Sequence, residues 1–249
     1  MSKRKLAALS VVALLIASCA YAAWIWYRLP GVEFLKRQNP KETALMRERG
    51  NERVQHWVPL DEVSERLVDA VLMAEDAGFF GHEGFDFYEM RRAFERNWEE
   101  GRTVRGASTI TQQVAKNLFL STRRSYGRKL EEALLAHRLE KALSKKRILE
   151  IYLNVIEWGD GIYGVEAASR DVFGKSADAL DAAEGALLAA MIASPLRLQP
   201  CERPKSVRTR QERILRWMKN AGRLSDSEYE AALAEELQLR KCGSFPREG

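Results

Sequence analysis

Two adjacent carboxylates, Glu75 and Asp76, stand at the end of a predicted helix and precede a loop rich in glycine and aromatic residues. The aromatic rings are those of Phe79, Phe80, Phe85 and Phe87. A carboxylate packed against apolar rings loses hydration, which raises its proton affinity and suits it to general acid–base catalysis. The segment therefore indicates a catalytic carboxylate. The competing interpretation is an ordinary polar helix end followed by phenylalanines of the hydrophobic core.

A second segment, residues 106–117, combines small, hydroxylated and amide side chains. Its polar members are Ser108, Thr109, Thr111, Gln112, Gln113, Lys116 and Asn117. Such a density of donors and acceptors suits sugar hydroxyls or phosphate oxygens. The segment lacks the glycine–lysine pattern of a nucleotide-binding phosphate loop, so ATP is not indicated. The competing interpretation is a helix start in which Ser108 or Thr109 is the N-cap.

A third segment places a carboxylate close to two cations. Arg128 lies four residues and Lys129 three residues before Glu132, so all three share one side of a helix. The arrangement alone is equally typical of a surface ion pair. The surrounding residues 102–147 carry twelve Lys and Arg against three Glu, within a chain of net charge +5. Near a membrane this concentration favours anionic headgroups, phosphates or pyrophosphates, with a solvated helix face as the alternative.

Helix signals dominate the part of the chain that must position these groups. Apolar residues recur at helical spacing over residues 60–75, and a further helix is predicted over residues 126–143. Ser144 and Ser225 are placed to cap two more helices, the second opening with a capping box. The alanine-rich residues 178–193 have the composition of a buried helix. Alternating strand patterns are scarce, so the sequence predicts a mainly α single domain.

The N-terminus has the features of a membrane anchor. Three basic residues at 3–5 precede an apolar run, residues 6–27, which as a helix reaches roughly 33 Å and can cross a hydrocarbon core of about 30 Å. The basic cluster before the run and the aromatic residues at its far end predict a cytoplasmic N-terminus, with the rest of the chain outside the cytoplasm. A cleaved signal peptide and a lipoprotein site at Cys19 are the competing interpretations, and both also place the domain outside.

The predicted organisation has four parts. They are a cytoplasmic basic tail over residues 1–5, a transmembrane anchor over 6–27, a charged connector over 28–59 that docks loosely or packs late, and a folded domain over 60–249. Cys201 and Cys242 then lie in a compartment where disulfides persist, but the sequence does not decide whether they pair. A domain outside the cytoplasm excludes nucleic acid as a partner.

Taken in order, these segments resemble the family-51 glycosyltransferases, which polymerise lipid II in bacterial cell walls. The resemblance runs from about residue 60 to residue 200 and is carried by five motifs. They are Glu75-Asp76-x-x-Phe79-x-x-His82-x-Gly84, Gly106-x-Ser108-Thr109-Ile110-Thr111-Gln112-Gln113-x-x-Lys116-Asn117, Arg128-Lys129-x-x-Glu132-Ala133, residues 146–154, and Gly164-Val165-Glu166-Ala167-Ala168 through Phe173-Gly174-Lys175. Two positions depart from the family pattern, because Ala107 replaces a usual glycine and Val172 a usual aromatic residue.

The resemblance implies a lysozyme-like helical glycosyltransferase domain behind a single transmembrane helix, with its cleft beside a hydrophobic jaw on the membrane. Glu75 would be the general base on the 4-hydroxyl of the acceptor sugar, and Glu132 would orient or stabilise as the second catalytic residue. The implied substrate-binding residues are Asp76, Phe79, His82, Ser108, Thr109, Gln112, Gln113, Lys116, Asn117, Arg128 and Lys129. Among them, Lys116, Arg128 and Lys129 would face the phosphates of the substrate.

The expected cofactor is none. His56, His82 and His137 are scattered, so the sequence predicts no metal-ligand cluster, although some relatives use a divalent cation, Mg or Mn, at the pyrophosphate. The expected partners are lipid II, the growing glycan chain, the membrane and other cell-wall synthases. Because the one Ser-x-x-Lys pattern runs from Ser2 to Lys5, ahead of the anchor, no transpeptidase domain is indicated and the monofunctional form is expected.

The resemblance thus predicts a bacterial inner-membrane enzyme with a periplasmic catalytic domain. Two functions of other kinds compete with it. A lysozyme-like glycan hydrolase also needs paired carboxylates, but it has less need of an anchor and a basic segment. A non-catalytic cell-wall scaffold would keep the fold without needing the charged groups.

Overall fold

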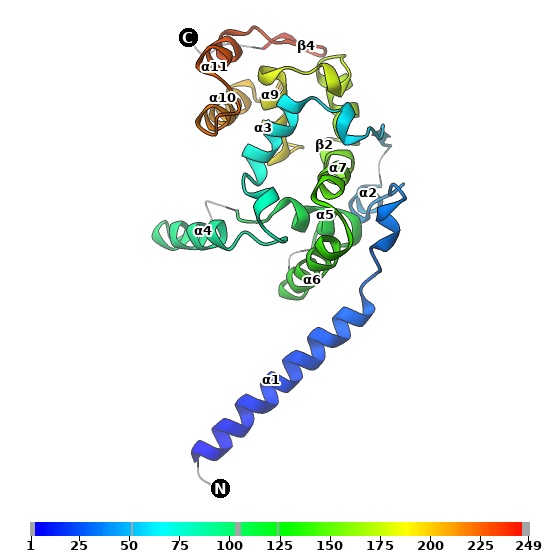
Figure 1. The fold of residues 1–249 in the computed structure, drawn as a ribbon, viewed down its shortest axis with the longest axis vertical. Helices are drawn as coiled ribbons and strands as arrows, with labels where there is room; N and C mark the ends of the chain where they lie inside the picture. The colour runs from blue at the N-terminus through cyan, green and yellow to red at the C-terminus, as the bar shows by residue number, and fades with distance from the viewer. Residues whose placement is uncertain (1–2, 51, 103–105, 124, 246–249) are drawn as a thin grey trace.

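The computed structural model of the protein describes residues 3–50, 52–102, 106–123 and 125–245. It is mainly helical, as predicted, and a long N-terminal helix projects away from the rest of the molecule (Figure 1). Residues 1–2 of the predicted basic tail and 246–249 of the predicted domain lie outside the described residues. The same holds for Arg105 and Arg124 of the basic segment.

The elements follow one another along the chain in this order. The first part contains α1 (Lys3–Arg28), the 3-10 helix η1 (Glu33–Lys36), α2 (Ala44–Arg49), β1 (Val54–Gln55), η2 (Leu60–Glu62), α3 (Glu65–Glu75), η3 (Phe79–Gly81) and α4 (Phe87–Glu99). The middle part contains α5 (Ile110–Phe119), α6 (Tyr126–Ala142), α7 (Lys145–Val155), β2 (Glu157–Gly159), β3 (Ile162–Tyr163), α8 (Val165–Val172), η4 (Ala177–Ala179) and α9 (Ala182–Ile192). The last part contains α10 (Pro204–Asn220), α11 (Asp226–Ala234), β4 (Gln238–Leu239) and β5 (Gly243–Ser244).

The centre of the core is α9, whose residues from Ala183 to Ile192 are all buried. It packs against α3 and α10, the helices beside it in the upper part of Figure 1. Gly185 permits the close crossing with α3, because a Cβ at this position would lie 2.9 Å from the Cα of Leu67. The crossing fixes the position of α3, whose last residue is Glu75.

The helix ends follow the predicted capping chemistry. Ser144 accepts a hydrogen bond from the backbone N–H of Arg147 at 3.2 Å, and Ser225 forms the predicted capping box. The buried alanine-rich helix begins later than the residues 178–193 predicted for it. Asp181 is its N-cap and accepts from the N–H of Glu184 at 2.9 Å, which ends the preceding 3-10 turn and starts α9 at Ala182.

The strands are too short to show an alternating pattern in the sequence. One sheet has the order β1-β3-β2, in which β1 is parallel and β2 antiparallel to β3. The second sheet is the antiparallel pair β4–β5. The first sheet joins the segment before α3 to the turn after α7, so it ties the connector to the domain.

The connector packs closely, in contrast to the loosely docked segment that its charge predicts. Val32 and Leu35 are fully buried in the main core. Leu45 and Met46 of α2 are buried in a second cluster with Tyr163. The charged residues of the connector are exposed, while a few of its apolar side chains are buried. The overall composition of the segment does not show which residues are buried.

The N-terminal helix fits a membrane anchor. Residues Leu9–Arg28 are long and apolar enough to cross a membrane, and this stretch is almost entirely exposed. Among the described residues it is the one helix with these properties, which confirms the predicted N-terminal apolar helix. Cys19 lies exposed on it as a free thiol, whereas Cys201 and Cys242 form a disulfide that links the loop before α10 to the β4–β5 turn. The pairing that the sequence left open is thus settled.

Candidate active site

Glu75 lies between two cavities at the C-terminal end of α3. The first cavity, of about 910 Å³, is lined by the end of α3, α4, residues 106–109 and α10. The second cavity, of about 570 Å³, is lined by α2, α5, α6 and residues 192–197. Glu75 lines both of them. A substrate in either cavity therefore has access to the same carboxylate.

A chain of hydrogen bonds holds this carboxylate in place. Gln113 donates from Nε2 to Oε2 of Glu75 at 2.8 Å, and its own Oε1 accepts from the Tyr152 hydroxyl at 3.4 Å. Burial raises the pKa of Tyr152 well above its ordinary value, so this hydroxyl stays a donor. Because the Tyr152 hydroxyl donates to the oxygen of the Gln113 amide, the NH2 group of this amide faces Glu75. The geometry leaves Oε1 of Glu75 free of any hydrogen bond within the described residues.

The electrostatic surroundings suit a base. Burial raises the pKa of Glu75 above its ordinary value of 4.5. The Gln113 hydrogen bond and the positive charges of Arg210 and Lys116 oppose this shift. A carboxylate with a raised pKa accepts a proton more readily than one in water, while nearby cations favour its ionised form.

Removing Arg210 is expected to move the pH profile of the reaction. The acidic limb of kcat/KM follows the ionisation of the base, because only the carboxylate form accepts a proton. Arg210→Met removes a positive charge that lowers the pKa of Glu75, so the pKa rises further and the acidic limb moves to higher pH. The measurement is the rate of substrate consumption from about pH 4, just below the ordinary pKa of a glutamate, to about pH 9.

Arg213→Met is the matched control for this experiment. Arg213 lines the first cavity with Arg210 and comes from the same helix, α10, but it is not among the main charges that shift the pKa of Glu75. Its removal is expected to leave the acidic limb in place. Equal shifts for the two variants would show that the limb reports the general charge of the cavity and not the environment of Glu75.

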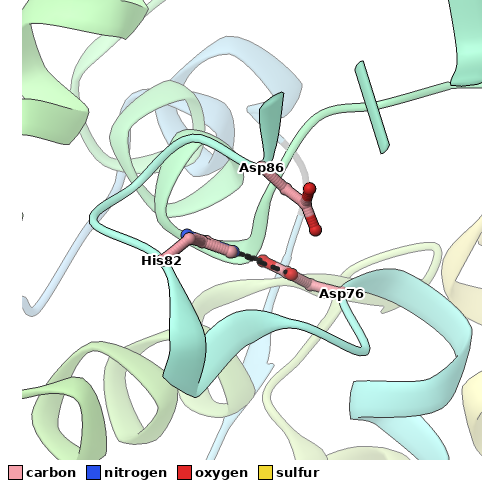
Figure 2. Close-up of side chains that lie close together, drawn as sticks. All are labelled: Asp76, His82 and Asp86. Carbon is pink, nitrogen blue, oxygen red and sulfur yellow. Dashed lines mark hydrogen bonds and ion pairs between the residues drawn. The ribbon is translucent and has the colours of Figure 1, made fainter. Parts of the chain in front are cut away.

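Asp76 links the motif loop to α5 and is buried. Its Oδ2 accepts from the backbone N–H of Ile110 at 3.0 Å, and its carboxylate also pairs with His82 Nε2 at 2.9 Å (Figure 2). The Nδ1 atom of His82 accepts from the N–H of Gly84 at 3.1 Å, so Nε2 carries the ring proton and donates it to Asp76. Both side chains are therefore engaged by protein groups. His82 lines neither cavity, so its predicted contact with the substrate stays a prediction.

Asp76, His82 and Asp86 converge closely enough to be considered as metal ligands (Figure 2), a grouping that the sequence did not indicate. The hydrogen bonds argue against a metal in this arrangement. A metal at His82 Nε2 would have to displace the proton, which the Gly84 N–H at Nδ1 holds in place. The Oδ1 atom of Asp86 is occupied as the N-cap of α4, accepting from the backbone N–H of Glu89 at 2.8 Å. The three side chains fit a structural network better than a metal site.

Some hydroxyl and amide residues of the second motif stabilise the start of α5, and some line one of the two cavities. Thr109 and Gln112 are buried and form a capping box at the start of α5, as the alternative interpretation proposed. Thr109 also donates to the carbonyl of Gly84 at 2.7 Å. Ser108 and Thr109 line the first cavity, whereas Asn117 lines the second. Phe79 is fully buried in the core and lines neither cavity.

Arg128 of the second cavity and its neighbour Lys129 flank the buried carboxylate of Glu132. Arg128 donates from Nη1 to Glu132 at 2.7 Å, and Lys129 pairs with the other oxygen of Glu132. The Nε of Arg128 is buried and has no hydrogen-bond partner among the described residues. Lys116 is half-buried in the same cavity, and burial lowers the pKa of its ammonium while Glu132 opposes the shift. An anion entering the second cavity would meet donors that the protein does not satisfy.

Sequence reasoning missed the arginines that distant helices bring to Glu75. Arg210 of α10 stands close enough to influence its pKa, and Arg213 lines the first cavity. Arg49 of α2 and Arg197 line the second cavity, where Glu157 holds Arg49 at 2.8 Å. None of these residues stands near a motif in the sequence, so only the packing of α9 and α10 against α3, and of α2 against α5, could reveal them.

Known proteins resemble this chain over most of its length. A family model described as Transglycosylase matches residues 41–219. A biosynthetic peptidoglycan transglycosylase of Methylobacillus flagellatus is 46% identical over 190 residues, which cover 73% of this chain and 82% of the relative. The protein of that name from Azoarcus sp. is 46% identical over 192 residues, covering 74% and 83%. The one from Thiobacillus denitrificans is 52% identical over 158 residues, covering 62% and 68%.

Among solved structures, penicillin-binding protein 1A from Haemophilus influenzae matches 80% of this chain and 20% of its own, with 24% identity and a TM-score of 0.46. The family model and the curated relatives confirm the resemblance that the motifs predict. A single transglycosylase domain is found, in agreement with the expected monofunctional enzyme. The chain belongs to the transglycosylase family.

Proposed function

We propose that this enzyme polymerises lipid II into linear glycan strands for peptidoglycan synthesis. The transfer forms a β-1,4 linkage with inversion and releases undecaprenyl pyrophosphate. The names of the relatives support peptidoglycan as the product. The observation that carries the proposal is Glu75, a desolvated carboxylate that lines two cavities, one of which contains unsatisfied cations.

Glu75 acts as the general base. The 4-hydroxyl of the acceptor sugar gives its proton to the carboxylate as its oxygen forms a bond to the anomeric carbon of the donor. The bond from that carbon to the pyrophosphate breaks on the opposite face, so an α linkage becomes a β linkage. A positioned base contributes about 10²–10⁴-fold to the rate. Because Oε1 of Glu75 is not used within the described residues, it is the oxygen available to the hydroxyl.

The cations of the second cavity receive the leaving group. Charge grows on the pyrophosphate as its bond to the sugar breaks, and fixed positive groups stabilise this charge without reorganising. Lys116 and Arg128 line the cavity, while Lys129 pairs with Glu132 and donates to the hydroxyl of Ser108, a residue of the first cavity, at 3.2 Å. Glu132 is then an orienting residue, because its buried carboxylate holds both Arg128 and Lys129 in place. A Mg or Mn ion would be held by substrate oxygens here, and assay with a chelator tests that contribution.

The exposed side chains fit a reaction at a membrane surface. We place the N-terminus in the cytoplasm, α1 across the inner membrane and the domain in the periplasm, where the Cys201–Cys242 disulfide can persist. Helix α4 exposes a row of large aromatic side chains that would favour the membrane interface. They are Phe87, Tyr88, Phe94 and Trp98. We assign this surface as the hydrophobic jaw that the family resemblance implies.

The experiment that tests the function is incubation of the full chain with labelled lipid II in bilayers or detergent, followed by gel separation. The expected result is a ladder of polymer that a muramidase digests. Consumption of preformed glycan strands in the place of lipid II would support the hydrolase. Binding of lipid II without consumption by folded protein would support the scaffold. Either of these results would overturn the proposed reaction.

A further inference from the structure

The end of the anchor helix is fastened to α6 by one arginine. Arg138 donates from Nη1 to the carbonyls of Leu29 at 3.0 Å and Pro30 at 3.2 Å, and from Nη2 to the carbonyl of Trp26. Its guanidinium also lies over the Trp26 ring, 4.0 Å from the centroid. A single side chain therefore contacts three backbone carbonyls, all within residues 26–30, and one ring at the point where the anchor ends.

The chemistry of a helix end explains why an arginine suits this position. The last carbonyls of a helix have no partner within the helix, and they carry the negative end of its dipole. Pro30 cannot continue the helix, so the carbonyls before it need another donor. The planar fork of a guanidinium can donate to several carbonyls and stack on a ring at the same time, whereas an ammonium cannot do both.

Two further contacts keep the anchor along α6. The Trp26 ring packs against His137 with centroids 6.3 Å apart, and Ile25 is buried. At the start of α6, a Cβ on Gly127 would lie 3.5 Å from the Tyr21 hydroxyl, so the Tyr21 side chain of the anchor reaches α6 there. Residues 127 and 137 are about 15 Å apart along a helix. Contacts at two separated points fix the direction of a rod, which a single contact does not.

The chain between the anchor and the core is held as well. Arg147 of α7 donates from Nε to the carbonyl of Leu35 at 2.9 Å and from Nη2 to the carbonyl of Gln38 at 3.0 Å. Leu35 itself is fully buried. The segment after Pro30 is thus bound to the domain within a few residues of the membrane helix and does not form a slack tether.

The residues between the two contacts on α6 are those proposed to receive the leaving group. Arg128, Lys129 and Glu132 lie on α6 between Gly127 and Arg138. The angle between α1 and α6 therefore sets the height and direction of the second cavity relative to the bilayer. A lipid-linked pyrophosphate is confined to the headgroup layer, so a domain that tilts freely would present the cavity to it only part of the time.

We propose that Arg138 is a positioning residue that fixes the angle between the membrane anchor and the catalytic domain. It touches no reacting atom. It holds the cations of α6 at one height and orientation above the membrane, so that substrates embedded in a bilayer reach the second cavity. The consequence for activity rests on the proposed function, whereas the fixed angle itself does not.

The fixed angle can be tested by distance measurement between two spin labels. Cys19 is the free thiol of the described chain, and Lys146→Cys adds a second label at an exposed site on α7. In the full chain in bilayers we expect a narrow distance distribution. Arg138→Ala should broaden it, Arg138→Lys should broaden it less, and Lys141→Ala should leave it unchanged, because Lys141 is exposed on α6 and pairs with Glu83. Equal widths for Arg138→Ala and the parent protein would overturn the proposal.

The functional consequence can be tested by comparing two forms of substrate. With lipid II in bilayers, we expect Arg138→Ala to lower the polymerisation rate about tenfold. With a short-chain, water-soluble analogue in detergent, the rate should stay within about twofold, because the domain can then meet its substrate from any direction. Equal losses in both assays would indicate damage to the domain and overturn the proposal. An inactive parent protein would overturn the proposed function, while the spin-label distances would still decide whether Arg138 fixes the angle.

Discussion

Glu75→Gln is expected to abolish polymerisation while the protein stays folded and still binds lipid II. The glutamine has the same shape, but it cannot take the proton of the acceptor hydroxyl. Loss of a positioned base lowers the rate by about 10²–10⁴-fold. The measurement is turnover of labelled lipid II, with binding of the same substrate followed separately. Full activity in this variant would rule out Glu75 as the base.

The same substitution is expected to leave thermal stability unchanged or higher at neutral pH. Because burial raises the pKa of Glu75 in the fold above 4.5, the folded state disfavours the ionised form. The ionised carboxylate thus lowers stability at pH values above this pKa, and the penalty disappears as the pH falls below 4.5. A glutamine removes the charge and can still accept the hydrogen bond that Gln113 donates. A variant that gains stability but loses turnover would show that Glu75 serves catalysis and not the stability of the fold.

Glu83→Gln is the matched control for Glu75→Gln. It makes the same chemical change in the same motif loop, at a side chain that is 83% exposed and pairs with Lys141 at 3.4 Å. We expect turnover and melting temperature to stay close to those of the parent protein, since exposed pairs of this kind contribute little. A loss of activity equal to that of Glu75→Gln would show that the loop tolerates no change of charge and would remove the special role of Glu75.

The features that the sequence predicted well are those set by neighbouring residues. Ser144 and Ser225 cap helices because a hydroxyl three residues before a backbone N–H can reach it whatever the rest of the fold does. The cluster of Arg128, Lys129 and Glu132 forms for the same reason, since helical spacing alone brings the three side chains together.

The features that the sequence did not predict depend on distant contacts. The aromatic loop shows this within a few residues, because Phe79 is fully buried while Phe80 and Phe87 are exposed. A local pattern cannot tell which ring faces a helix that comes from elsewhere in the chain. Arg210 reaches the surroundings of Glu75 because α9 and α10 pack against α3. The packing of the connector and the disulfide pairing depend on contacts of the same kind.

Asp76 shows how a predicted role and an observed position can differ. The motif implies a substrate-binding residue, and the carboxylate does line the first cavity. Its oxygens, however, already accept from the N–H of Ile110 and from His82. The structure thus favours a role in joining the motif loop to α5, which in turn carries Gln113 and Lys116. The substrate contact stays a prediction.

Lys116→Met is expected to lower turnover by about 10²–10³-fold without weakening the fold. Burial lowers the pKa of the Lys116 ammonium, so the protein leaves this charge poorly solvated, and an incoming pyrophosphate gains more from it than from a hydrated cation. Methionine has a similar length and no charge, so it fills the space and removes the cost of the buried ammonium. The measurements are single-turnover rates with labelled lipid II and the melting temperature.

Lys129→Met distinguishes two effects of a lysine: the effect of its position beside the substrate, and its effect on the total charge around the cavity. The Lys129 side chain is 48% exposed and is already paired with Glu132, so its charge is both solvated and partly neutralised. We expect a loss of less than about tenfold that shrinks further as salt is added, because salt screens exposed charges and reaches buried ones much less. The effect of Lys116→Met should persist at high salt. Losses of equal size and equal salt dependence would mean that the cavity attracts its substrate by overall charge, and that Lys116 does not stabilise the leaving pyrophosphate.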